Sequence, residues 1–96
     1  MDEFKLPTLT AAQYNEIKSI ANEAMMRQSL KDAQSCIDDL RSIERDLKGR
    51  CQIKLSELAS NLSEYCKRNS DKESYKSFVD RDLYVLHSFV DTGDAQ

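Results

Sequence analysis

The chain has 96 residues, of which 32% are charged, and its formal net charge at pH 7 is -3. A chain of this length forms one small domain, which buries only about 60–65% of the surface that its unfolded form exposes. The net charge is mild and both signs are interspersed, so the composition requires neither a nucleic acid nor an acidic membrane surface as a partner. With two glycines, one proline and no stretch of alternating hydrophobicity, the sequence excludes a β-rich fold and predicts an all-α fold.

The sequence shows no signal for export or membrane insertion. Its N-terminus lacks the basic region and apolar core of a signal peptide. The most apolar stretch, Leu83–Val90, is far shorter than the roughly 20 residues that cross a bilayer. Three cysteines without a CxxC pair suit a reducing compartment. We therefore expect a cytoplasmic protein that does not contact membranes.

The chain is expected to have three parts. Residues 1–9 form an N-terminal arm, residues 10–91 a single helical domain, and residues 92–96 a flexible acidic tail. The domain opens with a helix, because Thr10 and Gln13 have the spacing of a capping box.

An apolar stripe at helical spacing runs through the middle of the chain. It extends from Leu30 to Tyr65, and most of its steps are three or four residues, which is typical of coiled-coil-like packing. A new helix begins at its start, because Ser29 and Asp32 have capping spacing after a turn near Gln28.

Gly49 decides between two architectures. If the helix continues, one long helix from Ser29 to Arg68 keeps the stripe on one face, and the interior glycine costs only ~1 kcal/mol. This helix would be ~60 Å long, which one small monomer cannot cover, so it also predicts an oligomer. If Gly49 ends the helix, a helix from about Cys51 to Arg68 folds back in a compact four-helix arrangement. The unbroken stripe favours the long central helix within a bundle of three to four helices.

The last predicted helix is apolar on more than one side. It begins at a second capping-box pattern, Ser70 with Glu73. Its apolar residues are Tyr75, Phe78, Val79, Leu83, Val85, Leu86, Phe89 and Val90, with Tyr84 beyond them. Such a helix is either central in the bundle or shared between the core and a partner.

The side chains with catalytic or metal-binding chemistry form no recognisable site. Zinc could use the thiols and imidazole of Cys36, Cys51, Cys66 and His87, but no two of these have chelating spacing. The paired acids are Asp38 with Asp39 and Asp80 with Asp82. Both pairs suit solvated helix faces better than catalytic dyads, and no glycine-rich loop accompanies them. We expect no enzymatic activity, no cofactor and no metal.

A run of basic residues lies near the centre of the sequence: Arg41, Arg45, Lys48, Arg50 and Lys54, interrupted only by Glu44 and Asp46. The run suits an acidic protein partner. Nucleic acid is a weaker expectation, since no recognition-helix motif or interleaved aromatic residue accompanies the cations.

These patterns predict a small helical protein that binds another protein and changes its activity, as a regulator, inhibitor or antirepressor does. The comparison with such regulators rests on small size and helical architecture alone, and not on a sequence motif. The expected interface of a homo-oligomer, a dimer or tetramer, is Leu40, Leu47, Leu55, Leu58, Leu62 and Tyr65. The expected partner-binding residues are Phe78, Tyr84, Val85, Phe89, Arg41, Arg45 and Arg50. The alternatives are a secretion or assembly chaperone or adaptor subunit, and a nucleic-acid-binding helical dimer.

Overall fold

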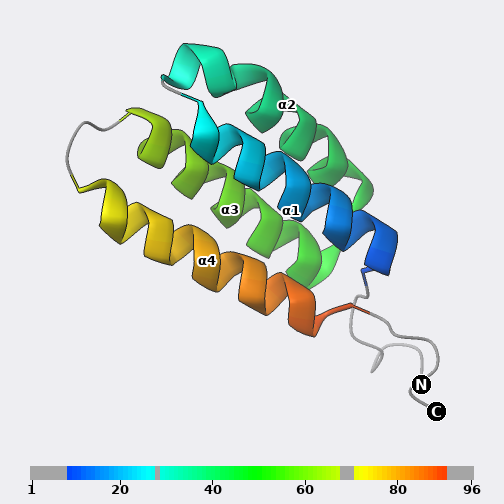
Figure 1. The fold of residues 1–96 in the computed structure, drawn as a ribbon. Helices are drawn as coiled ribbons and strands as arrows, with labels where there is room; N and C mark the ends of the chain where they lie inside the picture. Colours follow the sequence, from blue (N-terminus) through cyan, green and yellow to red (C-terminus); the bar gives the residue numbers. More distant parts are fainter. Residues whose placement is uncertain (1–8, 28, 68–70, 91–96) are drawn as a thin grey trace, which may run out of the picture.

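The fold is an all-α bundle (Figure 1). The computed structural model describes residues 9–27, 29–67 and 71–90. Over these residues the chain forms four helices: α1 (Ala11–Met26), α2 (Leu30–Asp46), α3 (Gly49–Lys67) and α4 (Lys72–Ser88). Successive helices run antiparallel and pack side by side, and α3 also contacts α1 (Figure 1). The prediction of an all-α bundle is confirmed.

The predicted long central helix is wrong, because the chain turns between α2 and α3. Leu47 is extended, with φ -99° and ψ 167°, and its N–H donates to the Glu44 carbonyl at 3.1 Å. Gly49 then has φ 61°, in the left-handed region that glycine enters without a Cβ clash. Leu47 and Cys51 are both buried, so the apolar stripe stays in the core on either side of the turn. Its continuity therefore did not distinguish a hairpin from a single helix.

The predicted caps of α1 and α2 are confirmed. The Thr10 hydroxyl accepts from the Gln13 N–H, and the Gln13 side chain accepts from the Thr10 N–H, both at 3.0 Å. The Ser29 hydroxyl accepts from the Asp32 N–H at 3.2 Å. The chain breaks between α1 and α2 as expected, while Gln28 itself lies outside the described residues.

The start of α4 differs from the prediction. Its N-cap is Asp71, which has φ 64° and makes no side-chain capping hydrogen bond. The predicted cap, Ser70, lies outside the described residues. The described N-cap thus lies one residue after the predicted one, and the predicted Ser70–Glu73 capping box involves a residue outside the described part of the chain.

The chain ends of the domain meet at the α1 N-terminus. Leu9 is fully buried, and its N–H donates to the Phe89 carbonyl at 3.0 Å. This contact ties the entrance of α1 to the exit of α4. The rest of the predicted arm, residues 1–8, and the predicted tail, residues 92–96, lie outside the described residues.

The central helix of the bundle is α3 and not α4. α3 contacts all the other helices, whereas α4 packs mainly on α3 and touches α1 only slightly. α4 therefore covers one edge of the bundle and leaves grooves on both of its sides, which are described below. None of the described helices is long and apolar enough to cross a membrane.

Candidate interaction surfaces

The predicted oligomer interface lies inside the single chain. Leu40, Leu55, Leu58 and Leu62 are fully buried, Leu47 is 6% exposed, and Tyr65 is half-buried. The stripe thus packs the helices of one chain against each other, and a second copy cannot reach it while this core is intact. In a dimer or tetramer of intact bundles, the seam would use residues other than these buried leucines, and the oligomer interface stays a prediction.

The predicted partner-binding residues of α4 do not form one surface. Phe78, Val85 and Phe89 are half-buried, whereas Tyr84 is 76% exposed. Phe78 lines a groove between α3 and α4, and Tyr84 lines a different groove between α1 and α4.

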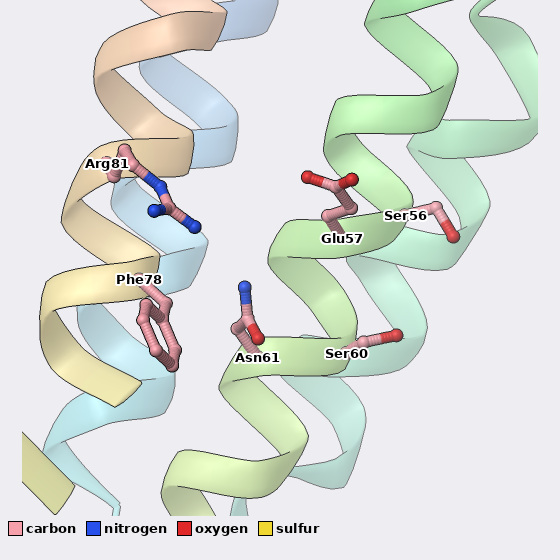
Figure 2. Close-up of a pocket in the computed structure, with 6 residues that line it drawn as sticks. All are labelled: Ser56, Glu57, Ser60, Asn61, Phe78 and Arg81. Carbon is pink, nitrogen blue, oxygen red and sulfur yellow. The ribbon is translucent and has the colours of Figure 1, made fainter. Parts of the chain in front are cut away.

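The α3–α4 groove carries charges of both signs (Figure 2). Its volume is about 380 Å³. Arg81 and Phe78 on α4 face Glu57 and Asn61 on α3, and the Arg81 guanidinium lies 5.3 Å from the Phe78 ring centre. With a carboxylate and a guanidinium on opposite walls, the groove does not select strongly for either charge.

Hydrogen bonds from Arg41 on α2 reach the face of α3 that carries Ser56 and Ser60. Ser56 and Ser60 also line this groove, and in Figure 2 their hydroxyls point away from Arg81. Arg41 donates to both hydroxyls, at 3.2 and 3.4 Å, and pairs with Glu44 at 3.0 Å. Arg41 is thus occupied by its own chain.

A buried carboxylate lies between α3 and α4. The side chain of Asp82 is only 1% exposed, and its Oδ2 accepts from the Asn61 amide at 2.7 Å. Its Oδ1 accepts no hydrogen bond among the described residues and lies 3.6 Å from the Lys54 ammonium. Burial raises the pKa of the Asp82 carboxyl, while the Asn61 hydrogen bond and the Lys54 charge oppose that rise. A hydrogen bond to Glu57, at 2.6 Å, is the main cause of a raised Lys54 pKa.

The interpretation of Asp80 and Asp82 as one solvated pair is therefore wrong for Asp82. Asp80 is exposed and pairs with Lys76 at 3.2 Å. Asp82, in contrast, shares the buried face of α4 with Val79 and Leu86. Val79, Asp82 and Leu86 are spaced by three and four residues, and this helical spacing is a sequence signal that could have revealed the buried position of Asp82.

The α1–α4 groove is aromatic and rich in hydrogen-bond donors. Its volume is about 450 Å³. The residues that line it are Ala11, Tyr14, Asn15, Lys18, Tyr84, His87 and Val90. Tyr14 and His87 meet edge to face, with ring centres 5.0 Å apart at 67°. None of the described lining residues carries a carboxylate.

The turn between α2 and α3 presents the part of the basic run that has no ion-pair partner among the described residues. Arg45, Lys48 and Arg50 are exposed, and none of them makes an ion pair with a carboxylate of the described residues. Ile53 follows on the first turns of α3 and is 61% exposed. Asp46 is the exposed acid within this segment.

The three cysteines are buried in the core. Cys36, Cys51 and Cys66 form no disulfide with one another, and desolvation raises the pKa of the Cys51 and Cys66 thiols. The Cys66 thiol donates to the Ala24 carbonyl at 3.5 Å, which helps fix α3 against α1. In the described parts of the chain, no three side chains of the types that bind metals come together.

No family model, no curated protein and no solved structure matches the chain. The function therefore has to be argued from these surfaces.

Proposed function

We propose that this chain is a non-enzymatic protein-interaction module, a small regulator or inhibitor that binds an acidic segment of another protein at the α2–α3 turn. The observation that carries the proposal is a set of three exposed cations without ion-pair partners in the described chain, next to an exposed isoleucine. These are Arg45, Lys48, Arg50 and Ile53.

The turn holds these side chains on a fixed backbone. Leu47 is 6% exposed and anchors the turn in the core, and Gly49 supplies its left-handed residue. A fixed backbone reduces the ordering that binding has to impose. The cations would steer an acidic segment toward the turn, and Ile53 would give it an apolar contact.

A nucleic-acid partner is the weaker alternative. Two members of the basic run are occupied within the chain, Arg41 by Glu44, Ser56 and Ser60, and Lys54 by Glu57 and Asp82. The three remaining cations are fewer than the roughly 6–10 phosphate contacts of a strongly salt-dependent DNA-binding protein. A secretion or assembly chaperone or adaptor subunit is the other alternative, and it would use the grooves beside α4 in place of the turn.

The test compares two charge-reversal variants. Arg45→Glu with Arg50→Glu alters the turn. Arg27→Glu with Lys31→Glu changes the net charge equally at the other end of α2, where Arg27 forms an exposed pair with Glu23. Each tagged protein is incubated with extract of its source cells, with and without nuclease, and captured proteins are identified by mass spectrometry. The leading one is then purified and titrated calorimetrically.

We expect the turn variant to bind that protein at least tenfold more weakly than the wild type and the control variant, with or without nuclease. Equal binding by both variants would remove the turn from the proposal. Capture that disappears with nuclease would replace the protein partner by nucleic acid.

Self-association stays a prediction. Light scattering over a concentration series measures the molar mass directly, and added nucleic acid shows whether the assembly depends on it. A dimer or tetramer would have to form without the leucine stripe, which is buried in one chain.

A further inference from the structure

We infer that the α1–α4 groove is a second binding site, and that it takes an acidic peptide segment of a partner protein with an aromatic residue in it. The site uses other helices and other side chains than the α2–α3 turn, so each of the two proposals can be refuted without refuting the other. The groove is defined by the side chains named above, of which Tyr14, Lys18, Tyr84 and His87 carry the argument.

Both walls of the groove are held in place. The Leu9 N–H bonds to the Phe89 carbonyl at 3.0 Å, which joins α1 to α4 at this end. Tyr14 and His87 reach across from the two helices and meet edge to face at 5.0 Å, a favoured aromatic geometry. The groove is therefore preformed, and a ligand does not have to order it.

The charge of the lining favours an anion. Lys18, His87, Asn15 and the tyrosine hydroxyls offer donors, and none of the described lining residues is a carboxylate. The neighbouring Asp80, one turn before Tyr84, is paired with Lys76 at 3.2 Å. The chain as a whole carries 17 acidic and 14 basic residues. The described lining of the groove differs from this average, because it contains a lysine and no acidic residue.

The shape and the aromatic rings favour a peptide. The groove is open to solvent, whereas sites for small molecules bury roughly 70–90% of the ligand. Tyr84 is 76% exposed and forms a free aromatic wall, and tyrosine is enriched among the residues that dominate protein interfaces. An aromatic side chain of the segment would stack on the tyrosines while flanking carboxylates reach Lys18 and His87.

The test uses a synthetic five-residue peptide, capped at both ends, with one phenylalanine between two pairs of acidic residues. It is titrated into the full ¹⁵N-labelled chain at about 0.15 M salt, where charges beyond roughly 8 Å are screened. We expect amide shifts confined to the first turns of α1 and the last turns of α4. Lys18→Glu and Tyr84→Ala, both at exposed positions, should each raise the dissociation constant at least tenfold.

Three controls make the inference refutable. Lys31→Glu, an equal charge change on α2, and Arg45→Glu with Arg50→Glu should each change the affinity less than about twofold, because they lie outside the groove. A peptide with glutamines in place of its acids should bind at least tenfold more weakly. Shifts centred on the α2–α3 turn, equal affinity for the glutamine peptide, or no shifts at millimolar peptide would each overturn the inference.

Discussion

Replacing Lys54 by methionine tests whether the buried Asp82 carboxylate is ionised and dependent on its neighbour. The Lys54 ammonium lies 3.6 Å from Asp82 Oδ1, and at an effective dielectric constant of about 20 their attraction is about 5 kcal/mol. Removing one partner of a buried ion pair costs about 3–5 kcal/mol, because the other charge stays buried. Since the Lys54 side chain is 23% exposed and partly solvated, we expect Lys54→Met to lower the free energy of unfolding by about 2–3 kcal/mol at pH 7.

The loss should depend on pH in a defined direction. Burial raises the pKa of Asp82 in the folded state above its ordinary value, so the folded chain holds this proton more tightly than the unfolded chain. The stability that comes from this proton is present in acid and is lost as pH rises through the folded-state pKa. Lys54→Met removes a charge that lowers this pKa, so the variant should approach wild-type stability in acid and fall below it toward neutral pH.

The measurement is urea unfolding at several pH values between about 4 and 7. Lys76→Met is the matched control, because Lys76 pairs with Asp80 at 3.2 Å where both side chains are more than half exposed, and such pairs contribute about 0–1 kcal/mol. Adding Asp82→Leu to Lys54→Met should restore about 2 kcal/mol by removing the stranded charge. A pH-independent loss no larger than that of Lys76→Met would show that the Asp82 charge is solvated and that the reasoning fails.

Three further outcomes are expected. Gly49→Ala should cost about 1–2 kcal/mol in urea unfolding, because alanine must adopt φ 61°, whereas Gly49→Asn should cost less; equal stability of both variants and the wild type would contradict the turn. Leu58→Asp should abolish helical circular dichroism at every protein concentration, since Leu58 is fully buried within one chain; a helical variant of lower molar mass would instead make the stripe a seam between copies. The Cys51 and Cys66 thiols should react with a thiol reagent much more slowly in the folded protein than in urea, since they are buried and their pKa values are raised; equal rates would show that this core opens readily.

Local patterns predicted the helices well, because each pattern acts within a few residues. At Thr10 and Ser29, the hydroxyl of the cap accepts a hydrogen bond from the backbone N–H three residues further on, and both bonds form. The turn at Gly49 could not be predicted in the same way. An interior glycine costs only about 1 kcal/mol in a helix, so the choice rests on which architecture buries the stripe better. Packing α2 and α3 against a shared core buries it within one chain.

The candidate sites were harder to predict, because a charged residue is available to a partner only if its own chain leaves it unpaired. From the sequence alone, the basic run predicts one continuous surface. In the fold, Arg41 and Lys54 are held by α2, α3 and α4, whereas the cations near the turn make no ion pair within the described parts of the chain. The lining of the α1–α4 groove comes from opposite ends of the chain, so no sequence window contains both Lys18 and His87. The charge of each surface thus depends on which acidic side chains the tertiary fold brings near it, and among the described residues that line the α1–α4 groove there is no carboxylate.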